Sequence, residues 1–209
     1  MNALQKLIAE NYKNTFSYKS YRERIDALHL EGKVTGPVQD EHLLEYSKLN
    51  VHRMDRWDKH TKLSEETVSF FSSIVEPLDV LIISEGWCGD AAQIVPVVIK
   101  MMEQSTSIDA HIILRDEHLE IMDMFLTNGK SRSIPMFIII DKQGQVLGKY
   151  GPRPEKSQIL MDELKASGAG KDQIKEKLHL WYARDKHAEI EKEFMSVMKG
   201  ALEHANRTL

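Results

Sequence analysis

The sequence has 209 residues, of which 42% are hydrophobic, 28 are Lys or Arg and 32 are Asp or Glu. A chain of this size can bury one substantial core, so we expect one domain with additions in preference to two equal domains. Because the charges nearly balance and no segment forms a basic arm, we expect neither nucleic acid nor a membrane surface as a partner.

Residues 1–78 carry the pattern of helices. Their apolar residues recur at spacings of three and four, and Thr35-Gly36-Pro37 separates two of the expected helices. A further helix is expected to begin at Ser64, whose hydroxyl can accept a hydrogen bond from the free N–H groups of the first turn. It should end before Pro77, because proline disfavours the helical conformation in the residue that precedes it.

The pattern changes to strands at Asp79. Residues 80–83 and 110–114 are short, apolar, β-branched runs, which are typical of strands buried on both faces. Residues 88–104 between them place their apolar side chains on one broad helical face. Strand, helix and strand therefore predict a parallel pair of strands with a right-handed crossover.

The second half of the predicted sheet is a hairpin. A helix near residues 117–126 leads to a third buried strand at 136–140. Residues 141–144 have the composition of a turn, and residues 146–150 complete the hairpin.

The C-terminal part is again helical. Pro154 suits the first turn of a helix that stops at Gly168-Ala169-Gly170. Residues 171–205 then form a helical pattern longer than an ordinary globular helix. We expect it to kink, to pack across the N-terminal helices or to form the seam of a homodimer, and we favour packing on the N-terminal helices.

Two features indicate the compartment. Residues 1–8 lack the apolar run of a secretion signal, and nowhere do about 18 uncharged apolar residues follow one another. The single cysteine, Cys88, excludes a disulfide within the chain, which fits a reducing compartment. We expect a cytoplasmic protein whose only disulfide chemistry is pairing with another molecule.

The segment Trp87-Cys88-Gly89-Asp90-Ala91 lies where the first buried strand ends and the next helix begins. A thiol at a helix N-terminus faces free N–H groups and the positive end of the helix dipole, both of which lower its pKa. Cys88 is therefore a candidate nucleophile. The carboxylate of Asp90 opposes this effect as a like charge, so the sequence leaves the activation of Cys88 open.

This segment resembles the W-C-G-P-C site of thioredoxin, and further landmarks agree in order and spacing. Pro96 matches the proline that kinks the active-site helix of that family, and Ile134-Pro135 matches its cis-proline dipeptide. Gly144, Val146 and Gly151 match the final hairpin. The spacing of the histidines matches no metal motif, so we expect no metal site.

The resemblance covers about residues 64–167 and implies an α/β, thioredoxin-like fold, a central mixed β-sheet flanked by helices. Residues 1–63 and 168–209 would then be N- and C-terminal helical extensions, the second packed on the domain. The resemblance makes Cys88 the catalytic residue and places Trp87, Gly89, Asp90, Ile134 and Pro135 at the substrate.

Two departures from the family pattern restrict the chemistry. Ala91 replaces the second cysteine, so no neighbouring thiol can resolve a mixed disulfide at Cys88, and Ile82 replaces the buried acid. We expect a monothiol thiol-disulfide oxidoreductase that acts on protein or small-molecule thiols and disulfides. It would need no resident cofactor, only an external thiol such as glutathione as co-reductant. The alternative is a non-catalytic module that binds a peptide or protein beside the cis-proline.

Overall fold

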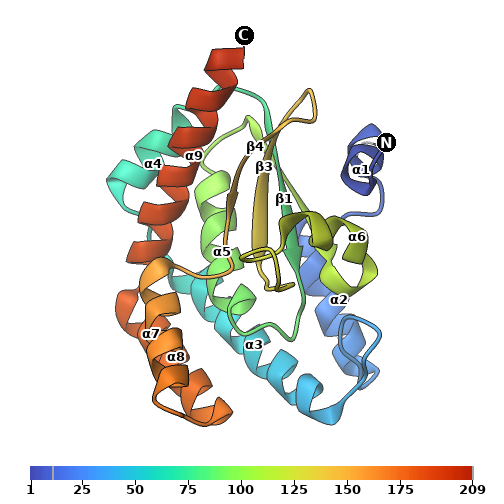
Figure 1. Cartoon of the computed structure of the whole chain (residues 1–209), viewed down its shortest axis with the longest axis vertical. Helices are drawn as coiled ribbons and strands as arrows, with labels where there is room; N and C mark the ends of the chain where they lie inside the picture. Colours follow the sequence, from blue (N-terminus) through green and yellow to red (C-terminus); the bar gives the residue numbers. More distant parts are fainter. Residues whose placement is uncertain (11, 209) are drawn as a thin grey trace.

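The computed structural model describes residues 1–10 and 12–208, with side chains up to residue 205. Within them four strands form one mixed sheet (Figure 1). The strands are β1 (Leu78–Ser84), β2 (Ile108–Leu114), β3 (Met136–Asp141) and β4 (Val146–Tyr150), in the spatial order β2-β1-β3-β4. β1 is parallel to β2 and antiparallel to β3, and β3 and β4 form an antiparallel hairpin. The predicted strands and their hairpin are confirmed.

Helices cover both faces of the sheet. α5 (Ala91–Met102) makes the crossover from β1 to β2 and contains Pro96. In Figure 1, α4, α5 and α9 lie on one side of the sheet, and α1, α2 and α6 lie on the other. Every residue of β1 is buried, as its unbroken apolar run predicts. The helix expected near residues 117–126 is instead three short pieces, the 3₁₀ turns Arg115–Glu117 and Asp123–Phe125 on either side of α6 (Leu119–Met122).

The N-terminal segment folds into the predicted helices. They are α1 (Ala3–Ala9), α2 (Tyr18–Leu30), α3 (Glu41–His60) and α4 (Glu65–Ser72). Each begins after a residue whose side chain accepts a backbone hydrogen bond, and Ser64 does so for α4 as predicted. Phe16 pairs with Ile112 through two backbone hydrogen bonds of 2.8 Å, which attaches this segment to β2.

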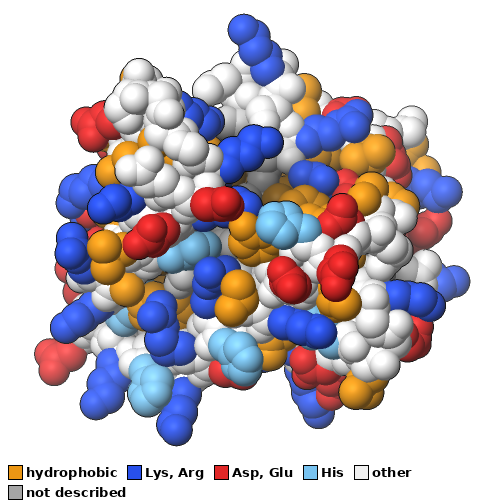
Figure 2. Space-filling view, turned by 90° about the horizontal axis from the view of Figure 1, so that it is seen from below, with side chains coloured by type: hydrophobic (Ala, Val, Ile, Leu, Met, Phe, Trp, Pro, Cys, Tyr) orange, Lys and Arg blue, Asp and Glu red, His pale blue; other side chains and the backbone are white. Residues whose placement is uncertain are grey.

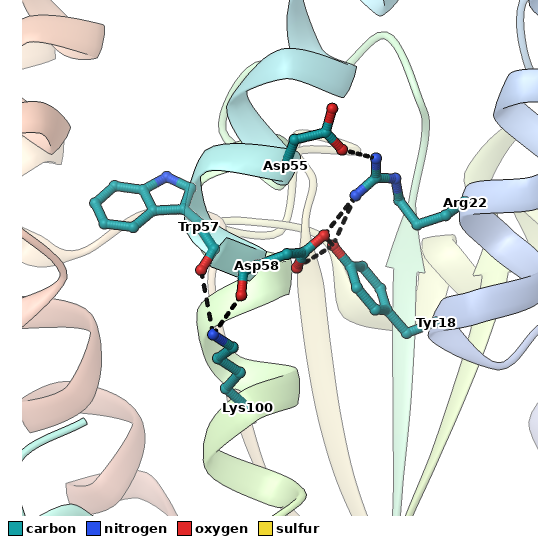
Figure 3. Close-up of polar contacts among 6 residues, drawn as sticks. All are labelled: Tyr18, Arg22, Asp55, Trp57, Asp58 and Lys100. Carbon is teal, nitrogen blue, oxygen red and sulfur yellow. Dashed lines mark hydrogen bonds and ion pairs between the residues drawn. The ribbon is translucent and has the colours of Figure 1, made fainter. Parts of the chain in front are cut away.

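Charged side chains fix α3 against two neighbouring helices (Figure 3). Arg22 of α2 forms ion pairs with Asp55 and Asp58 of α3, and the Tyr18 hydroxyl donates to Asp58 across 2.9 Å. Lys100 of α5 donates to the backbone carbonyl oxygen of Asp58, where the last carbonyl groups of α3 lack helical partners. These contacts hold α3 alongside α5. The first half of α3 therefore lies near the start of α5.

The C-terminal pattern divides into separate helices. α7 (Glu155–Ala166) and α8 (Lys171–Asp185) pack on each other as a hairpin, and the chain then continues past a bend into α9 (Ala188–Thr208) (Figure 1). Lys186 and His187 have positive φ angles of 51° and 64°, which break the long helix expected from the sequence. Of the three outcomes that we considered for this pattern, the chain adopts the kink.

α8, the first half of the predicted pattern, contacts the N-terminal helix α3 through Lys175 and Tyr46, so the packing that we favoured holds for this half. α9, the second half, packs mainly on β4 and α5. Its Phe194 is fully buried against Phe137 and Tyr150 of the sheet. Of the N-terminal helices, α4 packs on it, through Phe71. The apolar face of α9 is thus used within the chain, while a homodimer stays a prediction. Among the described residues, no helix has the length and apolar character needed to cross a membrane.

Candidate functional site

The loop from β1 to α5 places Cys88 against the dipeptide before β3. Only 8% of Cys88 is exposed, and its Sγ donates a hydrogen bond to the carbonyl oxygen of Ile134 across 3.3 Å. Sγ also accepts a hydrogen bond from the backbone N–H of Ala91 at 3.4 Å, the first residue of α5. Cys88 and Ile134 are therefore neighbours, as the resemblance implied.

The environment of Cys88 favours the thiol. Burial raises the pKa of Cys88 to about 12, and the nearby carboxylate of Asp90 adds to the increase. The N–H of Ala91 and the guanidinium of Arg153 lower the pKa, but they do not offset the loss of hydration. The balance that the sequence left open is decided by burial, and Cys88 is protonated at neutral pH.

Asp90 connects three parts of the chain. Its carboxylate forms an ion pair with Arg153 at 2.6 Å and accepts a hydrogen bond from the Tyr182 hydroxyl at 2.9 Å. It makes no side-chain capping bond to α5. Asp90 therefore links the start of α5 to the segment before α7 and to α8. Sequence reasoning missed Arg153 and Tyr182, because nothing local marks a partner 92 residues away.

The proline dipeptide is present but covered. The peptide bond between Ile134 and Pro135 is cis, and both residues are buried. Gly151 lies so close that a Cβ atom there would be 2.3 Å from the Pro135 carbonyl oxygen. In this conformation, the dipeptide does not offer an open edge to an extended peptide.

A cavity of about 510 Å³ leads to Cys88 between α3, α7 and α8. Its walls are formed by Leu43, Tyr46, Trp87, Met161, Ile174 and Leu178, and by the charged residues Asp90, Arg153, Lys165, Lys171 and Lys175. Figure 2 views the end of the molecule where these helices meet and shows a hollow in its surface, with blue, pale-blue and red side chains around orange ones. The volume is in the range of small-molecule sites.

His179 of α8 lies over the motif at one end of this cavity. A Cβ atom on Gly89 would be 3.0 Å from the His179 ring, so glycine at this position allows α8 to approach closely. The ring is 3.0 Å from the Gln93 amide. Burial and the cations Arg53 and Arg56 lower the pKa of His179 to about 4, so the imidazole is neutral at pH 7.

Comparison with known families agrees with this geometry. A family model described as Thioredoxin matches residues 36–165, more than half of the chain. The chain belongs to the thioredoxin family. Among curated proteins, none matches this sequence.

Two solved structures resemble this thioredoxin family member. A protein of unknown function from Pseudomonas aeruginosa aligns with a TM-score of 0.60 and 14% identity, over 92% of this chain and 97% of that one. An HIV epitope-scaffold aligns with a TM-score of 0.54 and 16% identity, over 88% of this chain and 99% of that one. At these identities the likeness shows the fold alone.

The other predicted site residues of this thioredoxin family member divide into two groups. Trp87 and Gly89 line the cavity beside Cys88, and the Arg115 guanidinium lies 4.8 Å from the centre of the Trp87 ring. Ile134 and Pro135 lie behind the thiol and do not line the cavity. The residues that sequence reasoning missed come from α3, from α7 and the segment just before it, and from α8. Among the described residues, no group of three or more His, Cys, Asp or Glu side chains is placed to hold a metal ion.

Proposed function

We propose that this thioredoxin family member is a binding protein that holds a small, largely apolar ligand in the cavity in front of Cys88. The observation that carries the proposal is the cavity itself, which ends at a buried, protonated thiol. Apolar side chains from α3, α7 and α8, including Leu43, Met161 and Leu178, would contact the ligand. Their burial by the ligand would supply the binding free energy.

Three features favour binding over thiolate chemistry. The thiolate is the nucleophile in disulfide exchange, and burial holds the pKa of Cys88 far above neutral pH. No second cysteine exists in the chain to resolve a mixed disulfide. The buried Ile134 and Pro135 favour a small ligand over the extended peptide of our earlier alternative.

A monothiol oxidoreductase is the second candidate, and one observation favours it. Cys88 lines the cavity, so a small disulfide could reach Sγ. The Cys88 thiolate would attack one sulfur, forming a mixed disulfide and releasing the other as a thiolate. An external thiol such as glutathione would then attack the mixed disulfide, restoring Cys88 and leaving with the bound group as a new disulfide.

The binding function can be tested with the uncharged fluorescent probe N-phenyl-1-naphthylamine. We expect the native chain to bind it, and Leu43→Trp, which fills the cavity from α3, to weaken binding by at least about tenfold. The matched control is Leu49→Trp, because Leu49 lies on the same helix but is 51% exposed and outside the cavity. No binding, or equal binding to both variants, would contradict the proposal.

The redox candidate has a separate test. The native chain and Cys88→Ser are compared in the glutathione-dependent reduction of hydroxyethyl disulfide. Because burial favours the thiol, we expect both to match the rate without protein. Turnover by the native chain that is lost in Cys88→Ser would favour the oxidoreductase over simple binding.

A further inference from the structure

We infer that the ligand of the cavity is an amphipathic anion, a molecule with an apolar body and one acidic group held by Lys165, Lys171 and Lys175 at the mouth. This inference rests on the proposed binding function and adds the chemical class of the ligand. Three observations carry it. The cavity lining has a net positive charge, its lysines lack close carboxylate partners among the described residues, and the rest of the lining is apolar.

The lining of the cavity is strongly cationic. It includes the side chains of Arg153, Lys165, Lys171 and Lys175 but one carboxylate, that of Asp90. With the histidines neutral these groups carry a net charge of +3, whereas the whole chain carries −4. A positive cavity in an acidic protein attracts anions locally while the rest of the surface repels them.

The lysines at the mouth are available to a ligand. Within the described residues, Lys165 and Lys171 form no ion pair. Lys175 contacts the Tyr46 hydroxyl and ring, and its nearest carboxylate, that of the 91% exposed Asp172, lies 3.8 Å away. By contrast, Asp90 and Arg153 neutralise each other, so the unmatched positive charge belongs to Lys165 and Lys171, while Lys175 is paired only with the exposed Asp172.

Two more cations, Arg53 and Arg56, lie near His179 without lining the cavity. Arg53 of α3 donates to the Asn50 side chain, and Arg56 donates to Gln93 and lies over the Trp57 ring. Neither has a carboxylate within ion-pair distance among the described residues. Both face His179, so they extend the positive potential toward the Cys88 end.

The apolar wall determines the rest of the ligand. Met161, Ile174 and Leu178 come from the same two helices as the lysines, and Leu43 faces them from α3. An ion without an apolar body would leave these side chains in contact with water, and an uncharged apolar molecule would leave the lysines without a partner. A molecule that carries both parts satisfies both.

The test compares two probes that differ by one sulfonate. The anionic probe is 8-anilinonaphthalene-1-sulfonate, and its uncharged counterpart is N-phenyl-1-naphthylamine. We expect the native chain to bind the anionic probe about tenfold more tightly, with a preference that decreases at high salt. The double variant Lys165→Gln/Lys171→Gln should bind the anionic probe about fivefold more weakly than the native chain does and bind the uncharged probe equally well.

The matched control is Lys59→Gln/Lys177→Gln, which removes the same charge from exposed positions outside the cavity. Equal affinity for both probes, or equal losses in the two double variants, would overturn the inference and leave the binding function standing. An anionic probe that binds Leu43→Trp as well as the native chain would overturn it too, because the probe would lie elsewhere. If neither probe binds, the proposed function itself fails.

Discussion

The thiol of Cys88 donates its hydrogen bond to the backbone carbonyl oxygen of Ile134, 3.3 Å away. This contact joins the two features on which the resemblance to thioredoxin rests, the cysteine motif and the proline dipeptide. It also occupies a backbone group that an extended peptide would need. The site is closed toward the sheet, and Cys88 lines the cavity between α3, α7 and α8.

The first prediction concerns the reactivity of Cys88. Because burial raises its pKa to about 12, the thiolate population at neutral pH should be on the order of a thousandfold below that of a free thiol. Alkylation by iodoacetamide across a pH series measures this. We expect a midpoint well above the free-thiol value in the folded chain and an ordinary midpoint in urea. A folded-state midpoint below the free-thiol value would instead identify a primed nucleophile.

Asp90→Asn should change both the thiol and the stability. The variant removes a charge that raises the pKa of Cys88 and leaves Arg153, which lowers it, unpaired, so alkylation should become faster at a given pH. The Asp90 and Arg153 side chains are 12% and 16% exposed, so losing the pair should lower the free energy of unfolding by about 3 kcal/mol.

Urea denaturation measures that loss. The control is Asp172→Asn, whose side chain is 91% exposed and which should change the free energy of unfolding by less than about 0.5 kcal/mol. Equal effects of the two substitutions would mean that Asp90 does not hold the helices together.

Glu85, which is fully buried beside the motif, should make stability depend on pH. Burial raises its pKa from 4.5 to about 7, although the N–H of Asp116 donates to it. Between these values the unfolded chain ionises and the folded chain does not, so the free energy of unfolding falls as pH rises from about 4.5 to 7. Glu85→Gln cannot ionise, so its stability should not show this loss, which amounts to about 3 kcal/mol.

Urea denaturation at pH 4.5 and pH 8 tests this. At each pH the free energy of unfolding of the variant is compared with that of the native chain. For Glu85→Gln this difference should shift in favour of the variant from pH 4.5 to pH 8. For the exposed Glu120→Gln it should be the same at both pH values. A constant difference for Glu85→Gln as well would show that folding does not change the pKa of Glu85.

The C-terminal helix should contribute to the core. Phe194 of α9 is fully buried among Phe71, Phe137 and Tyr150, so Phe194→Ala should lower the free energy of unfolding by about 4 kcal/mol. Leu180→Ala on α8 is the control, because Leu180 is 40% exposed and its truncation leaves no internal cavity. Similar small losses for both would mean that α9 is attached only loosely.

The sequence alone determined the elements of the sheet and the position of the motif. The apolar runs at 80–83 and 136–140 became β1 and β3, and Ser64 caps α4, because hydrophobic periodicity and capping act over a few residues. The thioredoxin landmarks likewise have fixed local spacings. These features allowed the fold to be predicted without any long-range contact.

Only the tertiary structure decided the state of the site. The pKa of Cys88 depends on the segments that bury its thiol away from water. The contacts of Asp90 depend on the positions of Arg153 and of Tyr182 on α8. The break at Lys186 divided one helical pattern into α8, which lines the cavity together with α7, and α9, which covers the sheet. Desolvation and pairing arise between segments far apart in the chain, and no local pattern of residues encodes them.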